Sequence, residues 1–123
     1  ETINLKSFTE FIKTTSVSVG ISSLNDTPID VLLSYLKVAD YVQLMGIEHI
    51  GVQGQSFDNR VFERIKVIKE SFPNHPIVID GSVNKETILS LKQAGVNRLI
   101  VGSAIVSATN PYEAYKELMS IIN

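Results

Sequence analysis

The sequence has no cysteine and no tryptophan among its 123 residues. Without cysteine, disulfide bonds and thiolate chemistry are excluded for these residues, and this composition is typical of a reducing compartment. No apolar run approaches the roughly 20 residues of a membrane helix. Residues 1–6 also have no signal-peptide pattern. We therefore expect a cytoplasmic protein with no membrane partner.

The sequence also lacks a large excess of charge of either sign. Its 11 basic and 13 acidic side chains give a formal net charge of −2, so nucleic acid is not an expected partner. Hydrophobic residues make up 44% of the chain and charged residues 20%, which is typical of a soluble globular protein. No linker divides the chain, so residues 1–123 are expected to form a single domain or segment.

Helical and strand patterns alternate along the chain. Apolar residues at helical spacing predict helices over residues 4–14, 28–37, 57–72, 85–94 and 111–121. Runs of β-branched and other apolar residues predict strands over residues 16–22, 41–45, 76–79 and 98–101. This alternation predicts an α/β fold with a parallel sheet and right-handed crossovers.

Residues at the ends of these segments signal where helices begin and end. Thr27 is a predicted N-cap, followed by Pro28 as the first helical residue. Asn84 and Asn110 precede two further helices in the same way, and Gly95 is a predicted C-cap. The helix over residues 57–72 is expected to end at Pro73-Asn74-His75-Pro76, so each helix predicted after the first strand has at least one marked boundary.

The strand over residues 76–79 ends at a carboxylate, Asp80. Ligands of parallel α/β sheets bind at the carboxyl ends of the strands, so Asp80 is a candidate catalytic residue. Such a group can remove a proton beside a carbonyl or ligate a metal. Equally, it can accept hydrogen bonds from turn amides and have only a structural role.

Small residues follow three of the predicted strands: Gly51 and Gly54, Gly81 and Ser82, and Gly102 and Ser103. Phosphate groups bind where backbone N–H donors can approach closely and few side chains intervene. For any one pair, a tight turn is the ordinary explanation. The last two pairs follow adjacent strands, and together they favour a phosphate site.

The remaining polar candidates are weaker. His49 lies in a loop and is most simply a solvated surface group, and His75 lies at the opposite end of its strand from Asp80, which indicates a structural role. Gln53 and Gln55 could hydrogen-bond a sugar hydroxyl.

Four motifs of this chain resemble the C-terminal half of ribulose-phosphate 3-epimerase. They are Leu24-Asn25-Asp26-Thr27-Pro28, the loop from Met45 to Phe57, Asp80-Gly81-Ser82-Val83-Asn84, and Val101-Gly102-Ser103-Ala104-Ile105. Their order and spacing match that family along nearly the whole chain. The resemblance implies that the chain is the C-terminal half of a (β/α)₈ TIM barrel, with about four βα units and a leading helix.

The resemblance also implies roles for individual residues. Asp80 matches the family's second catalytic aspartate, which ligates a divalent cation (Zn, Fe, Mn or Co) and moves a proton at carbon 3 of a phosphorylated sugar. The positions that match the family's phosphate site are Gly54, Gly81, Ser82, Gly102 and Ser103.

Two departures from the family pattern leave the exact sugar open. The loop that follows residues 41–45 lacks the family's Ser and Asn-Pro-Gly, and it has Gly46 and an extra residue near Glu48. Ser82 stands where the family has glycine. The alternative hypothesis is therefore a non-catalytic or retuned binder of sugar phosphates.

By the resemblance, the other catalytic aspartate and the histidine metal ligands lie on strands of a first half. A full barrel has roughly 250 residues, and the chain begins with Glu1 rather than Met. Four strands would also leave two open sheet edges. We therefore expect a segment that is inactive alone and needs an N-terminal half barrel. A half barrel that closes as a homo-oligomer, or that serves only in assembly, is the less favoured reading.

Overall fold

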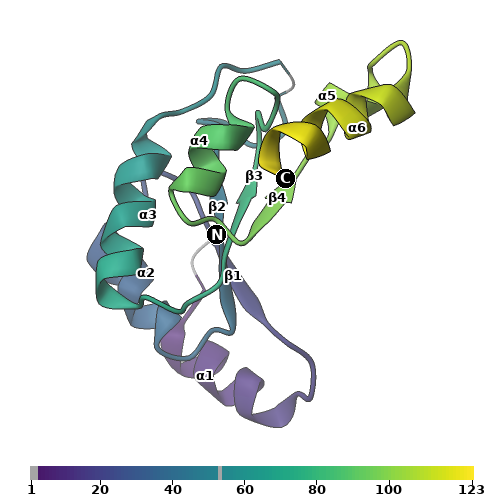
Figure 1. The fold of residues 1–123 in the computed structure, drawn as a ribbon. Coiled ribbons are helices and arrows are strands. Elements are labelled where there is room, and N and C mark those ends of the chain that lie inside the picture. The colour runs from purple at the N-terminus through teal and green to yellow at the C-terminus, as the bar shows by residue number, and fades with distance from the viewer. Residues whose placement is uncertain (1–2, 53) are drawn as a thin grey trace.

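The computed structural model describes residues 3–52 and 54–123. Four strands form one parallel sheet in the order β1-β2-β3-β4 (Figure 1). Their bounds are β1 Gly20–Ser23, β2 Tyr41–Met45, β3 Ile77–Asp80 and β4 Arg98–Ile100. This arrangement confirms the predicted parallel βα architecture.

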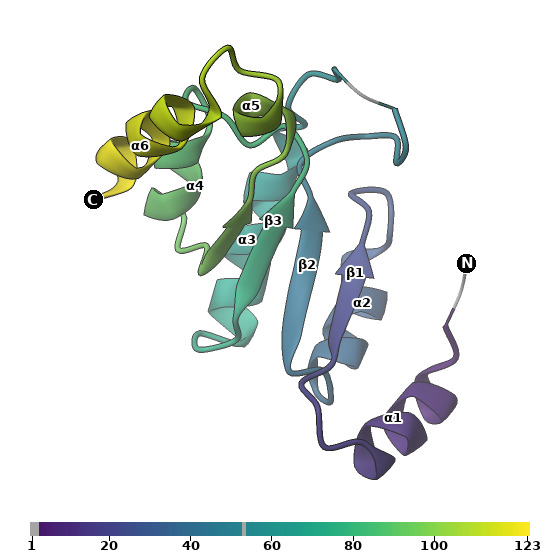
Figure 2. The same ribbon diagram turned by 90° about the vertical axis from the view of Figure 1, so that its right-hand side faces the viewer.

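The described residues form six helices beside the strands: α1 Leu5–Thr14, α2 Ile29–Leu36, α3 Arg60–Ser71, α4 Ile88–Gln93, α5 Ser103–Val106 and α6 Pro111–Ile122. Helices α2, α3 and α4 cover one face of the sheet (Figure 1). On the opposite face, turned toward the viewer in Figure 2, none of the described residues forms a covering helix. No helix of the described residues is long and apolar enough to cross a membrane.

The hydrophobic core lies between the sheet and these three helices. The alternate strand residues Val42, Leu44, Ile77 and Ile79 are fully buried there. Burying one such side chain stabilises a protein by about 1.5–3 kcal/mol. The core therefore fixes which side chains of each strand point away from the helices.

Nine strand residues point to the side without helices, which we call the open face. Their neighbours along the strands belong to the core, and side chains alternate across a sheet. The open face consists of Gly20, Ser22, Tyr41, Gln43, Met45, Val78, Asp80, Arg98 and Ile100. It has one carboxylate and one guanidinium group.

The register of the strands aligns their carboxyl ends. Met45 lies opposite Asp80, and Asp80 lies opposite Ile100. The loops that follow β2, β3 and β4 therefore leave the sheet at one level and can form a common site.

The first strand is shorter than predicted. The alternating pattern over residues 16–22 predicts a strand, but β1 begins at Gly20, and Val17 is 66% exposed. The reason lies in the partner strand: Gly20 pairs with Tyr41, the first residue of β2. Residues before Gly20 have no strand beside them with which to pair.

Several predicted helix starts are also wrong. Thr27 makes no capping bond, and Pro28 is itself the N-cap of α2. The third helix begins at Arg60, because residues 57–59 form part of the preceding loop. Asn84 caps a turn that precedes α4, since its Oδ1 accepts from the amides of Glu86 (3.0 Å) and Thr87 (3.2 Å).

Two other boundary predictions are confirmed. Gly95 has φ +89°, the left-handed conformation expected just after a helix. The Asn110 side chain accepts a hydrogen bond from the Glu113 amide (3.3 Å) at the start of α6. The sequence patterns did not predict the short helix α5.

Candidate functional site

A cavity of about 520 Å³ lies at the carboxyl ends of β2, β3 and β4. The structure brings together there all the residues predicted from the sequence to form the site: Gly54, Asp80, Gly81, Ser82, Gly102 and Ser103. They come from three different loops. The alignment of the strand ends is what makes this convergence possible.

Asp80 is the last residue of β3 and belongs to the open face. The side-chain amide Nε2 of Gln43, on the neighbouring strand, lies 3.5 Å from Asp80 Oδ2. The main-chain oxygen of Asp80 accepts a hydrogen bond from the Gly46 amide (2.7 Å). The main chain at Asp80 is thus fixed, while its carboxylate lines the cavity.

The turn after β3 has two consecutive residues with positive φ. Gly81 has φ +101°, and a Cβ there would lie 2.9 Å from Ile47 Cγ1, so only glycine fits without displacement. Ser82 has φ +51° and is the one non-glycine residue with positive φ in the described part of the chain. For a residue with a Cβ, this conformation costs roughly 1–2 kcal/mol.

The Ser82 hydroxyl links two loops of the site. It donates a hydrogen bond to the main-chain oxygen of Gln55 (2.7 Å), in the loop that follows β2. Its proton is therefore engaged within the protein, and an anion would meet the backbone N–H of Ser82 rather than its hydroxyl. This bond gives the serine, which replaces the family's glycine, a physical role.

The Gln55 side chain is hydrogen-bonded within its own loop. Its Oε1 accepts from the His49 amide (3.0 Å), and its Nε2 donates to the main-chain oxygens of Val52 (2.8 Å) and His49. The side chain therefore holds its own loop together, and both of its amide hydrogens are donated within that loop. Gln53, the other glutamine considered, lies outside the described residues.

The turns after β3 and β4 present backbone donors to the cavity. Within residues 3–52 and 54–123, the hydrogen bonds outside the helices and strand ladders include none that uses the amide of Gly81, Ser82, Gly102 or Ser103 as its donor. A Cβ added to Gly102 would meet no heavy atom within 4 Å, so the backbone there is open to an approaching group. Such amides at adjacent strand ends are suited to an anion such as phosphate.

The described residues hold no complete set of metal ligands. Asp80 is the one carboxylate on the open face, and the described residues contain no group of three or more His, Cys, Asp or Glu side chains able to hold a metal ion. Asp80 fits as a single oxygen ligand. A complete coordination sphere would need side chains from outside this chain.

The two histidines lie outside the cavity lining. His49 is exposed, as expected. His75 lies before β3, with its ring 6.0 Å from that of Phe72, and its Nε2 is buried without a partner among the described residues. Burial, with a smaller contribution from the charge of Lys69, lowers the pKa of His75. These contacts agree with a structural role.

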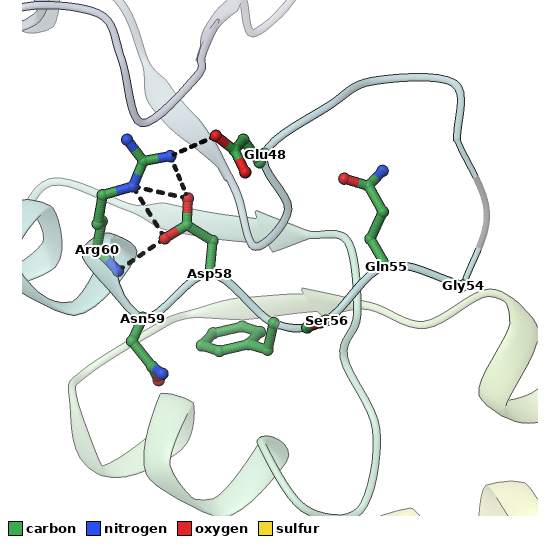
Figure 3. A pocket seen from close by; sticks show the side chains of 8 residues that line it. Glu48, Gly54, Gln55, Ser56, Asp58, Asn59 and Arg60 are labelled. Atoms are coloured by element: carbon green, nitrogen blue, oxygen red, sulfur yellow. Dashed lines mark hydrogen bonds and ion pairs between the residues drawn. The ribbon is translucent and has the colours of Figure 1, made fainter.

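A second cavity, of about 640 Å³, lies on the other side of the loop after β2 and contains an ion network that the sequence patterns did not reveal (Figure 3). Arg60 contacts Asp58 (2.8 Å), Asp26 (2.6 Å) and Glu48 (3.8 Å). Hydrogen bonds from Arg60 are the main cause that lowers the pKa of Asp58 to about 2. These charged groups bind one another, so we place the chemistry in the cavity that contains Asp80.

The network continues beneath the loops and fixes them to the sheet. The Asn25 amide donates to Met45 O (3.0 Å) and to Asp58 Oδ2 (2.8 Å). The buried side chain of Arg64 donates to Ser23 Oγ (3.0 Å) and Thr27 O (2.6 Å). The loops after β1 and β2 are therefore joined to each other by Asn25 and Asp58, and Arg64 of α3 fixes the loop after β1.

Solved structures with a similar fold are about twice the size of this chain. A 3-hexulose-6-phosphate synthase matches 99% of this chain and 59% of its own, with a TM-score of 0.71 and 19% identity. A thiamine phosphate pyrophosphorylase from Pyrococcus furiosus matches 99% of this chain over 55% of its own length, with a TM-score of 0.67 and 23% identity. These neighbours confirm the fold as about half of a TIM-barrel-like domain.

Sequence comparison gives the family. The model described as the ribulose-phosphate 3-epimerase family matches residues 1–106. Ribulose-phosphate 3-epimerases from Bacillus subtilis and Candida glabrata are 32% and 29% identical over 89% and 87% of this chain. The chain spans 52% and 43% of the length of these two relatives. This chain belongs to the ribulose-phosphate 3-epimerase family.

Proposed function

We propose that this chain forms the phosphate-binding half of a ribulose-phosphate 3-epimerase-like enzyme and provides one of its two catalytic carboxyl groups. One observation supports this most directly: Asp80 and the amides after β3 and β4 line the same cavity. In such a cavity the amides can bind the phosphate of a sugar while the carboxylate accepts or donates a proton at the sugar carbon.

In this proposal the substrate phosphate accepts hydrogen bonds from the amides of Gly81, Ser82, Gly102 and Ser103, with Gly54 on the opposite loop. The ketose then extends toward Asp80. The Asp80 carboxylate accepts the proton from carbon 3 on one face, and the C–H electron pair passes into an enediolate. A second acid returns a proton to the other face of carbon 3, which inverts that centre.

The family resemblance also implies a divalent cation. We propose that one carboxylate oxygen of Asp80 binds this cation. When bound, such a cation stabilises negative charge on the substrate oxygens. The other ligands are proposed to come from residues outside this chain, since the described residues hold no complete set. Gln43 is placed to restrain Asp80 Oδ2 while the carboxylate serves both roles.

We further propose that residues 1–123 are one segment of a cytoplasmic barrel, completed by a preceding half that carries the second acid. The curated relatives are about twice as long as this chain. The segment alone is then expected to be inactive, since a two-acid reaction needs both halves. Pairing with another copy of the chain is the competing way to close the barrel.

The test is Asp80→Asn in the full-length protein that carries this chain. Removal of a general acid–base is expected to reduce kcat by about 10²–10⁴, while inorganic phosphate should still bind because the amide donors remain. Asp30→Asn, at the exposed start of α2, is the control and should keep full activity. Undiminished turnover by Asp80→Asn would refute the assignment, and a wild type that binds but does not epimerise would identify a sugar-phosphate binder.

A further inference from the structure

Arg98 is the one cation on the open face. Its neighbour Leu99 packs against the core, so Arg98 and Ile100 point to the opposite side of β4. The Arg98 side chain is exposed, and no ion pair among residues 3–52 and 54–123 includes it. Arginine stays protonated in proteins, so this charge persists wherever the side chain lies.

A closed barrel would bury this charge. The interior of a (β/α)₈ barrel is filled by layers of side chains that point inward from the strands. Arg98 is in register with Val78, two residues before the level of Asp80 and Ile100, which corresponds to about 7 Å along the strand. Its Cα therefore lies one layer below the cavity, and an unpaired charge buried at that level is strongly unfavourable.

We infer that the surface covering the open face carries an Asp or Glu side chain that pairs with Arg98, and that this surface is not a second copy of the chain. The planar guanidinium group matches a carboxylate with two parallel hydrogen bonds, which suits a buried pair. This inference rests on the proposed barrel, which supplies the burial.

A second copy does not have the required group. Its open face would bring the same nine residues, with Asp80 at the mouth of the cavity as the one carboxylate. Two copies would place two Arg98 side chains inside one barrel without an acid at their level. The occupant is therefore a segment of different sequence, and the length of the curated relatives leaves room for a segment of this size in the same polypeptide.

The experiment compares the thermal unfolding of the full-length protein with that of Arg98→Met and Arg98→Lys at two pH values. At pH 7, Arg98→Met leaves the carboxylate buried and unpaired, so its Tm should fall by about 10 °C. Arg98→Lys keeps the positive charge, so its Tm should fall by less than that of Arg98→Met. Near pH 4 the unpaired acid of the Arg98→Met protein, whose pKa is raised by burial, is protonated and neutral, so the difference from wild type should shrink. Lys116→Met, on the exposed side of α6, is the control and should be near wild type at both pH values.

An Arg98→Met protein as stable as wild type at pH 7, or a loss of stability that does not depend on pH, would overturn the inference. If Arg98→Met does not fold at pH 7, recovery of folded protein near pH 4 provides the same test. Sedimentation equilibrium tests which surface covers the open face. A barrel built from two copies of this chain would contradict the inference. Epimerase activity is measured separately on the wild type, so a failure of the proposed function is distinguished from a failure of this inference.

Discussion

Ser82 combines an unfavourable backbone conformation with a favourable side-chain contact. Its φ of +51° is a conformation that glycine adopts without cost, and its hydroxyl donates to Gln55 O. The two effects are of similar size, because a hydrogen bond contributes about 0.5–1.5 kcal/mol. The serine therefore joins two loops of the site with little net change in stability.

This balance predicts different effects for two substitutions. Ser82→Ala keeps the strained backbone and loses the bond, and should lower the free energy of unfolding by about 1 kcal/mol. Ser82→Gly loses the bond but also relieves the strain, and should stay near wild type. Urea unfolding of the full-length protein measures both. Ser82→Ala more stable than Ser82→Gly would contradict the assigned geometry, and Ser120→Ala, an exposed serine of α6, is the control.

At the scale of elements, Asp58 determines where α3 begins. Its Oδ1 accepts from the Arg60 amide (3.0 Å), and its carboxylate also pairs with the Arg60 side chain. Asn25 adds a bond from the loop after β1. Residues 57–59, which the sequence patterns assign to the helix, are held in the preceding loop by these bonds.

The lowered pKa of Asp58 predicts a pH dependence. Because the pKa falls from 3.8 to about 2 on folding, its contribution to stability is complete above pH 4 and is lost as the pH falls toward 2. Asp58→Asn removes the ion pair, so the variant should be less stable than wild type at pH 7 and should converge with it near pH 2. Unfolding midpoints across this range measure the effect. A constant difference from pH 7 to pH 2 would show that Asp58 does not titrate in this way.

The elements differ in how well their sequences predict them. Strand β2 begins and ends where predicted, because its apolar residues lie in a central strand with partners on both sides. Strand β1 is an edge, so its length depends on where Tyr41 begins the next strand rather than on its own alternation. A local pattern holds no information about a partner about 20 residues away.

The residues of the candidate site also differ in how well the sequence predicts them. Asp80, Gly81 and Gly102 were identified because each lies at the end of a predicted strand, and the parallel sheet then brings them together. The bonds among Asn25, Asp58 and Arg60 were missed, because Asn25 and Asp58 are 33 residues apart and meet only in the folded chain. The roles of Gln55 and Ser82 depend on loop conformation, which residue type alone does not determine.

For the whole molecule, the main feature is a sheet covered on one face and bounded by two unpaired edges, β1 and β4. Edge strands with free backbone groups tend to associate with other chains. Ile100, on β4, and Tyr112 and Tyr115, on α6, add exposed apolar surface nearby in sequence.

We therefore predict that the isolated 123-residue chain self-associates as its concentration rises, without one defined stoichiometry. The full-length protein, whose edges are proposed to be paired, should not do so under the same conditions. Sedimentation velocity over a range of concentrations measures this difference. A monodisperse, stably folded monomer of the isolated chain would show that the open face needs no cover.

The hydrogen bond between the Gly46 amide and Asp80 O has a consequence for how the loop after β2 can vary. A Cβ at position 46 would overlap the carbonyl oxygen of Gly81, so the two loops touch through their main chains at this point. Length changes that accumulate beyond residue 46 leave this junction, and the amides that follow β3, where they are. The loop beyond residue 46 can thus change in length without moving the amides to which we propose that the phosphate binds.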